Sequence, residues 1–250
     1  MRCSLASSLV AAALVLAGCS LLAAPKTPLT PPVLDPDLVQ RGAILFADSR
    51  LSGDGSRACA TCHPGGGSDY KVYRFGYVVP PYTEGGRRTL TLRGMWQTAP
   101  YLWDDSAPTV KGVVDRMLAV EMLGGKLEGR DRDALETYLL SIPAFDRGRI
   151  QPDGSVVEPT TLLARRGAAV FDQWCRECHV PPPFMQPRTA DMGTGQWAVP
   201  TLRGVAVSGP YGHDGRWPDL ETVTRSMADH QQAHLTDEQL AQLLAYLQLL

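Results

Sequence analysis

Two motifs far apart in the chain combine cysteine and histidine in the same order, Cys59-Ala60-Thr61-Cys62-His63 and Cys175-Arg176-Glu177-Cys178-His179. A Cys-x-x-Cys-His run is typical of covalent attachment of c-type heme. On one helical turn the two thiols can each form a thioether with a heme vinyl group, and the adjacent imidazole then points at the iron. The sequence therefore predicts two covalently bound c-type hemes, with His63 and His179 as proximal iron ligands.

The start of the chain has the pattern of an export signal over residues 1–18, in which Arg2 supplies a positive charge and residues 9–16 an apolar stretch. Leu16-Ala17-Gly18-Cys19 resembles the lipobox of bacterial lipoproteins, which implies that Cys19 heads the mature chain and carries lipid. The alternative is an uncut transmembrane helix over residues 5–24. Both interpretations place the bulk of the protein outside the cytoplasm. We expect a lipid-anchored protein on the periplasmic side of a bacterial membrane.

Cysteine usage supports the heme prediction. Of the six cysteines, Cys3 lies in the signal and Cys19 is expected to carry lipid, so only the four motif cysteines remain. Two disulfides would be usual in an exported protein, and a zinc site is the other alternative. The two cysteine pairs lie much farther apart than the pairs of a zinc ribbon. Because the heme motifs use every remaining cysteine, heme attachment is favoured over both alternatives.

Composition bounds the class of protein and its partners. The chain has 250 residues, 44% of them apolar, and 24 Lys and Arg against 26 Asp and Glu, which suits one or two globular domains. A net charge of -2 gives no electrostatic reason to expect nucleic acid. The 24 glycines and 20 prolines predict abundant loops. Prolines are dense between residues 24 and 37, so residues 19–37 are predicted to form an extended tether without a helix.

An internal repeat indicates how the two motifs are positioned. Arg41-Gly42-Ala43-Ile44-Leu45-Phe46 precedes the first motif and returns before the second as Arg166-Gly167-Ala168-Ala169-Val170-Phe171. Behind each motif, Thr-Leu-Arg-Gly leads to Pro-Tyr at the same interval. Each half then closes with an apolar stripe at helical spacing, and a capping box of Thr236 and Gln239 precedes the second stripe. The stripes are Leu135, Tyr138, Leu139 and Ile142, and Leu243, Tyr246, Leu247 and Leu250.

A first helix, a heme motif and a closing helix that can pack on the first are the organisation of a small cytochrome c domain. We therefore expect a mostly α-helical protein with two tandem cytochrome c-like heme domains and abundant loops. The N-terminal domain is predicted over residues 38–142 and the C-terminal domain over residues 160–250. Residues 143–159, which contain Pro152 and Gly154, are the expected linker.

With these features the chain resembles the bacterial diheme cytochrome c peroxidase family, which includes related heme enzymes that oxidise tryptophan in a partner protein. The resemblance covers residues 38–250 and rests on both heme motifs and on several further strings. These are Leu45-Phe46, Leu51-Ser52, Trp103-Asp104, Glu121-Met122, Val199-Pro200-Thr201-Leu202-Arg203 and Pro210-Tyr211-Gly212-His213-Asp214-Gly215. It implies reduction of hydrogen peroxide to water with electrons from a small exported donor, a cytochrome c or a cupredoxin.

The resemblance also implies roles for individual residues. His63 would hold the heme at which peroxide reacts, and His179 and Met227 would be the axial ligands of an electron-input heme. Trp103 would lie between the hemes. Glu121 would deliver the proton that cleavage of an O–O bond requires, although it stands two residues nearer to Trp103 than in the family.

Plainer readings of these residues stay open. Trp103 is alternatively an ordinary core aromatic, and Glu121 a solvated helix carboxylate. His213 is expected to order the loop beside the second heme. The resemblance implies a calcium ion between the domains as well, but Arg88 stands where an asparagine is expected.

Two features of the first half point in opposite directions. No histidine lies between His63 and His179, so the first iron lacks the capping histidine of many family members and is expected to stay open to peroxide. Met117, however, follows Tyr101 at the interval at which Met227 follows Tyr211. If Met117 binds iron, both hemes are six-coordinate and the protein only transfers electrons. Oxidation of an organic or protein substrate is the third alternative.

Overall fold

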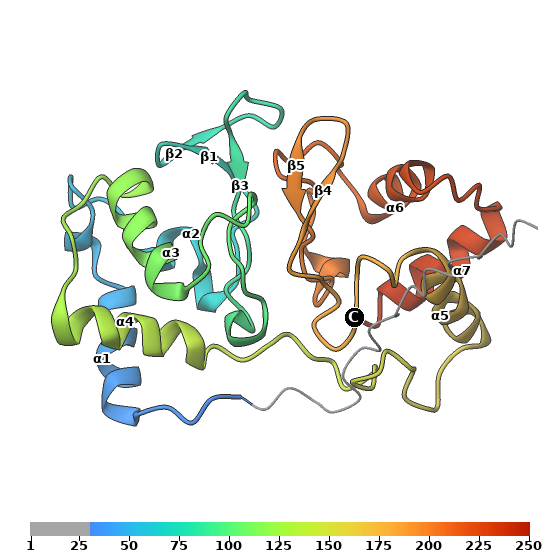
Figure 1. The fold of residues 1–250 in the computed structure, drawn as a ribbon, viewed down its shortest axis with the longest axis horizontal. Coiled ribbons are helices and arrows are strands. Elements are labelled where there is room, and N and C mark those ends of the chain that lie inside the picture. Colours follow the sequence, from blue (N-terminus) through green and yellow to red (C-terminus); the bar gives the residue numbers. More distant parts are fainter. Residues whose placement is uncertain (1–30) are drawn as a thin grey trace, which may run out of the picture.

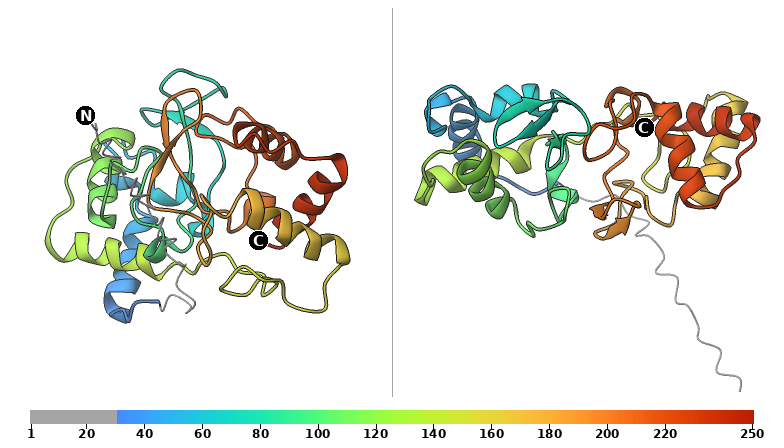
Figure 2. Two further views of the ribbon diagram at one scale, coloured as in Figure 1. Left: turned by 45° about the vertical axis from the view of Figure 1, so that its right-hand side comes forward. Right: turned by 90° about the horizontal axis from the view of Figure 1, so that it is seen from above.

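The computed structural model describes residues 31–250, and its two halves lie side by side (Figures 1 and 2). The predicted signal, the lipidation residue Cys19 and residues 19–30 of the predicted tether lie outside the described residues. Within residues 31–250, no helix has the length and apolar character needed to cross a membrane.

Helices dominate both halves and are joined by long loops, which confirms the predicted mostly α-helical fold. The N-terminal half contains α1 (Pro36–Phe46), η1 (Ser49–Leu51), α2 (Cys59–Cys62), η2 (Pro64–Gly66), β1 (Val72–Arg74), β2 (Tyr77–Val79), β3 (Arg87–Arg88), η3 (Met95–Gln97), α3 (Val110–Arg116), η4 (Met117–Glu121) and α4 (Gly129–Ser141). The C-terminal half contains α5 (Leu162–Trp174), β4 (Thr189–Asp191), β5 (Gln196–Ala198), η5 (Val205–Val207), α6 (Leu220–His230) and α7 (Asp237–Leu247).

The same helix pair forms the base of each half, α1 on α4 and α5 on α7. A Cβ atom added to Gly42 would lie 2.0 Å from the Ala134 carbonyl oxygen, and one added to Gly167 would lie 1.9 Å from that of Gln242. Only glycine therefore permits the helices to approach this closely. In both halves a phenylalanine ring of the first helix lies 5.1 Å from a tyrosine ring of the closing helix. The internal repeat read from the sequence is thus a repeat of packing.

Two separate apolar cores follow from this arrangement. The first contains Phe46, Leu135 and Leu139, and the second contains Phe171, Leu243 and Tyr246. Ile150 and Val156, from the segment expected to be only a linker, form a β-bridge and contact the second core. Burial of these apolar side chains is favourable in free energy, so this part of the segment packs on the core and is not exposed.

The first helix also begins inside the predicted tether, which corrects that boundary. Pro36 occupies the first helical position, where its missing N–H costs nothing, and the Asp35 side chain accepts a hydrogen bond from the Asp37 N–H. The prolines of this stretch are expected to exclude a helix, but the last of them, Pro36, begins α1.

Short antiparallel hairpins, which the sequence analysis did not predict, face each other where the halves meet (Figure 1). The first sheet has the strand order β2-β1-β3, with Val72 opposite both Val79 and Arg88. The second pairs β4 with β5 and sets Ala190 opposite Trp197. Strands of two or three residues are too short for an alternating pattern to be recognised.

Candidate functional site

The first heme motif lies on α2 and the turn that follows it. The His63 N–H donates to the Cys59 carbonyl at 2.9 Å, which sets the histidine directly after the helical turn of the two thiols. The ring atom Nδ1 lies 3.1 Å from the Gly67 carbonyl oxygen. Because a carbonyl can only accept, Nδ1 carries the proton and Nε2 keeps its lone pair. This is the orientation in which a histidine binds iron through Nε2.

The second motif repeats this geometry in a turn after α5. The His179 N–H donates to the Cys175 carbonyl at 3.0 Å, and Nδ1 lies 3.0 Å from the Phe184 carbonyl oxygen. Burial lowers the pKa of His63 and lowers that of His179 to about 4, so both imidazoles are neutral at physiological pH. A neutral imidazole is the form that binds a metal.

The motif cysteines suit thioether attachment. All four carry free thiols, so no disulfide forms among residues 31–250. Burial raises the pKa of Cys59 to about 11 and that of Cys175 to about 12, so both stay thiols near neutral pH. Paired thiols beside a neutral imidazole fit a covalent heme in each half.

Trp103 lies at the junction of the two halves. Its residue exposure is 8%, its Nε1–H donates to the Arg88 carbonyl at 2.7 Å, and its own carbonyl accepts from the Ala198 N–H at 2.8 Å. Its ring lies 6.3 Å from the imidazole of His213. The predicted bridging residue is therefore buried and contacts the C-terminal half directly.

Glu121 is the last residue of η4, a π-helical turn, and its carboxylate is held at one side. The Gly76 N–H donates to Oε2 at 2.9 Å, while Oε1 has no hydrogen-bond partner within residues 31–250. The Gly53 N–H fixes the end of the turn by donating to the Met122 carbonyl at 2.9 Å. Burial raises the pKa of the Cys62 thiol, and the Glu121 charge contributes to that shift, which sets the carboxylate near the first heme motif.

Arg57 and Gly76 complete this cluster, and sequence reasoning missed both. The Arg57 guanidinium donates to the Gly76 carbonyl, while the Gly76 N–H donates to the Glu121 carboxylate. A Cβ on Gly76 would lie 2.2 Å from the Glu121 carbonyl, and its φ of 76° also favours glycine. The contact joins residues far apart in the chain, so no local pattern signals it.

The two candidate methionines occupy different helical structures. Thr109 and Asp219 cap α3 and α6 at equivalent positions of the repeat, each accepting a backbone N–H of the first turn. α3 passes into a π turn at Met117, whereas Met227 lies within the regular helix α6. Met117 packs against the first core, while Met227 is not among the described residues that pack against the second.

Arg88 links the halves beside Trp103. Its exposure is 8%, and its guanidinium donates to the carbonyls of Ser208 and Gly212 at 3.0 and 3.3 Å. Its backbone N–H donates to the His213 carbonyl at 2.7 Å. No group of three or more His, Cys, Asp or Glu within residues 31–250 is arranged to hold a metal ion. The calcium ion that the resemblance implies, and that Arg88 calls into question, is untested. The Arg88 guanidinium faces the Ser208 and Gly212 carbonyls.

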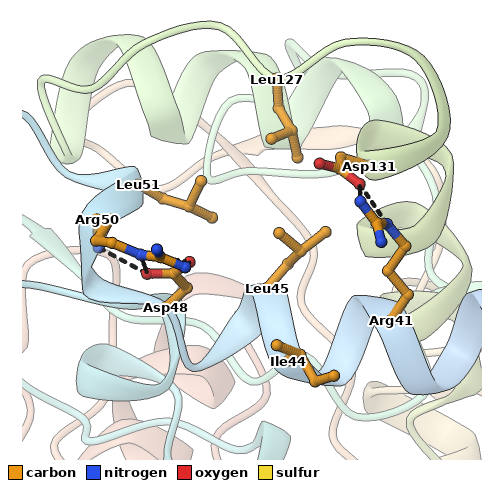
Figure 3. Close-up of a pocket in the computed structure, with 8 residues that line it drawn as sticks. All are labelled: Arg41, Ile44, Leu45, Asp48, Arg50, Leu51, Leu127 and Asp131. Atoms are coloured by element: carbon orange, nitrogen blue, oxygen red, sulfur yellow. Dashed lines mark hydrogen bonds and ion pairs between the residues drawn. The ribbon is translucent and has the colours of Figure 1, made fainter.

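A surface cavity of about 470 Å³ lies elsewhere, between α1 and the segment leading into α4 (Figure 3). Leu45, Leu51 and Leu127 line it, with an Arg50–Asp48 ion pair of 2.7 Å at one side and an Arg41–Asp131 pair at the other. It contains none of the predicted site residues, so we assign it no part in the site.

Comparisons with known proteins agree with the motifs. The sequence model of the di-haem cytochrome c peroxidase family matches residues 36–147. The methylamine utilization protein MauG of Methylorubrum extorquens is 28% identical over 248 residues, covering 76% of this chain and 68% of that protein. The protein of the same name from Methylophilus methylotrophus is 27% identical over 239 residues, covering 74% of this chain and 70% of its own length.

Solved structures show the same fold. A hydrazine synthase structure from Kuenenia stuttgartiensis has a TM-score of 0.72 at 20% identity and covers 98% of this chain and 100% of that chain. The diheme peroxidase BthA of Burkholderia thailandensis has a TM-score of 0.65 at 17% identity, covering 88% of both chains. A MauG-like protein associated with microbial copper homeostasis gives 0.65 at 20% identity, covering 90% of this chain and 91% of that chain.

The family implies two c-type hemes, and the two repeated Cys-x-x-Cys-His turns fit them. The resemblance recognised in the sequence is therefore confirmed: the N-terminal half matches the di-haem cytochrome c peroxidase family model, and the chain is similar to MauG proteins over most of its length.

Proposed function

We propose that this protein reduces hydrogen peroxide to water, with electrons from a small exported donor such as a cytochrome c or a cupredoxin. Each turnover consumes one peroxide, two protons and two electrons and yields two water molecules. When bound, the hemes supply an iron that takes up peroxide and a second iron that receives electrons. We further propose that lipid on Cys19 anchors the protein on the periplasmic side of the membrane.

The state of Glu121 is the observation that carries the proposal. A general acid must be positioned, and it must keep an oxygen available for the proton it transfers. The Gly76 N–H holds Oε2 at 2.9 Å and leaves Oε1 without a protein partner among the described residues. Arg57 donates to the Gly76 carbonyl, so the residue whose N–H holds the Glu121 carboxylate is itself held in place. In this proposal Oε1 delivers a proton to the departing oxygen of peroxide.

The remaining residues fit separate tasks in the two halves. His63 binds the peroxide-reactive iron in the first half, and His179 with Met227 binds the electron-input iron in the second. Packing of Met117 against the first core supports a first iron that stays open. Trp103 contacts both halves and would lie between the two hemes.

A second candidate is an electron-transfer protein in which both irons have His and Met ligands. The observation that favours it is the equivalent position of Met117 and Met227 in capped helices of the repeat. A thioether on the first iron would close the position that peroxide needs. Oxidation of an organic or protein substrate is the further alternative, since the same open iron would serve it.

The test replaces one carboxylate by its neutral isostere. Glu121→Gln keeps the contact with the Gly76 N–H but cannot supply the proton, so we expect peroxide turnover to fall about 10²-fold. Glu84→Gln, in an exposed loop, is the matched control and should leave turnover unchanged. Heme content, measured as the pyridine hemochrome, should be the same in all three proteins. Turnover of Glu121→Gln close to that of the unchanged protein would reject Glu121 as the acid.

A further inference from the structure

Two tryptophans at the junction of the halves each lie beside an arginine, and the two arginines are adjacent in the chain. The Arg88 guanidinium carbon lies 5.6 Å from the centre of the Trp103 ring. The Arg87 guanidinium carbon lies 4.6 Å from the centre of the Trp197 ring. Both distances are typical of cation–π contacts. β3 of the N-terminal half thus presents one positive charge to each indole.

An imidazole connects the two indoles. His213 stacks on Trp197 with ring centres 3.6 Å apart and an interplanar angle of 12°. The His213 ring also lies 6.3 Å from the Trp103 ring, at an interplanar angle of 70°. Trp103, His213 and Trp197 therefore form a row of rings from the buried junction to the half-buried face of the β4–β5 hairpin.

The positive charges along this row are not neutralised. Within residues 31–250, neither Arg87 nor Arg88 has a carboxylate within 4.0 Å, and the hydrogen bonds of both guanidiniums go to backbone carbonyls. Burial lowers the pKa of Arg88 to about 10, so it is still charged at neutral pH. Burial also lowers the pKa of His213 to about 4, which keeps the imidazole neutral. The neighbouring Asp214 is paired with Arg216 at 2.8 Å.

A positive charge beside an indole makes the ring harder to oxidise. Loss of one electron turns the ring into a radical cation, which a fixed positive charge nearby destabilises. The attraction between a guanidinium and the electron-rich ring is lost in the same step. The effect is largest where water is excluded, as at Arg88 and Trp103.

We propose that Arg87 and Arg88 form a positive guard that keeps Trp197 and Trp103 reduced while strong oxidant is generated in the protein. The guard rests on the proposed function only in naming peroxide as the natural source of that oxidant. Without it, an oxidant would take one electron from an indole, and the radical cation would lose its N–H proton to water. The neutral radical would then add dissolved dioxygen and become a permanently oxygenated tryptophan. The arginines are positioning residues for the redox state of the rings and take no part in the chemistry of peroxide.

The test compares variants that differ in charge. Arg88→Gln and Arg88→Lys both lose the guanidinium fork, but only the lysine keeps the charge. The holoprotein is exposed to photogenerated ruthenium(III) tris-bipyridine, which takes one electron and becomes ruthenium(II), and in a parallel arm to hydrogen peroxide. Mass spectrometry of peptides measures oxidised Trp103 and Trp197, with Trp174 as an internal control.

In Arg88→Gln we expect oxidation of Trp103 to rise roughly tenfold, while Arg88→Lys stays near the unchanged protein. Arg87→Gln should produce the corresponding rise at Trp197 alone. Equal oxidation in the Gln and Lys variants would show that Arg88 acts only through packing, and unchanged oxidation in the Gln variants would reject the guard.

Two features keep the test decisive. Arg87 is exposed, so Arg87→Gln tests the guard at Trp197 even where Arg88→Gln fails to fold. The ruthenium arm requires no reaction with peroxide. A protein that ignores peroxide but shows the tenfold rise with ruthenium(III) would contradict the proposed function and support the guard.

Discussion

The two halves have the same arrangement of helices and heme motif, and they differ at the helical turn that carries the candidate methionine. Each has a helix pair closed on a glycine, an identical histidine orientation and a capped helix that leads to a methionine. In the C-terminal half this helix continues regularly through Met227, whereas in the N-terminal half it becomes a π turn from Met117 to Glu121. A π turn adds a residue to one turn and rotates the side chains that follow.

Under the proposed function, this difference would give one of two similar heme domains a second task while both keep the same helix packing. The π turn is where the N-terminal half carries Glu121, fixed by the Gly76 N–H. The equivalent part of α6 carries no such carboxylate contact to a hairpin within residues 31–250. Reactivity in the first half and electron input in the second would then differ through one turn of helix, since π turns are frequent at functional sites.

The largest expected effect comes from removing one heme at a time. Cys59→Ser with Cys62→Ser should halve the covalent heme, measured as pyridine hemochrome after acid–acetone extraction, and abolish peroxide turnover. Cys175→Ser with Cys178→Ser should halve the heme as well but leave a first heme that still binds peroxide analogues. If both variants bind peroxide analogues equally well, the proposed assignment of peroxide reaction to the first heme and electron input to the second is wrong.

Ligand exchange at the two methionines should sharpen the comparison. A thioether ligand raises the heme potential, so Met227→His should lower the potential of the C-terminal heme in a redox titration. Met117→His should not close the first iron, because residue 117 packs against the first core, so peroxide turnover should continue. An unchanged titration curve for Met227→His would remove Met227 from the ligands.

The helix pairs should respond equally, because their packing is repeated. Alanine at Gly42 or Gly167 forces a methyl group against a backbone carbonyl, and we expect a loss of about 1–3 kcal/mol in the free energy of unfolding. Gly125→Ala is the control, since a Cβ there meets nothing within 4 Å. Thermal unfolding followed by circular dichroism provides the measurement. A destabilised Gly125→Ala with unaffected Gly42→Ala would contradict the close-approach argument.

The smallest expected effect concerns the closing helices, which are capped differently. Thr236 and Gln239 form a capping box at α7, whereas the Glu128 side chain makes no capping bond at α4. Thr236→Ala should therefore cost about 0.5–2 kcal/mol of stability, and Glu128→Ala close to nothing. Chemical denaturation of both variants checks the difference, and equal losses would contradict it.

What the sequence could predict is the part of the structure that local pattern encodes. The heme motifs, the paired apolar stripes and the Thr236 capping box each involve residues within a few turns of one another. The row of Trp103, His213 and Trp197, and the contact of Glu121 with Gly76, join segments far apart in the chain. Apolar periodicity carries no signal for such contacts, nor for the change from α to π at Met117.

The spin state of the first heme in the half-reduced protein tests the central claim most directly. With the C-terminal heme reduced, the account predicts a high-spin ferric signal from the His63 heme that hydrogen peroxide perturbs, because its sixth position is open. A low-spin first heme whose sulfur-to-iron band disappears in Met117→Ala would contradict the account and establish Met117 as the ligand that closes the site.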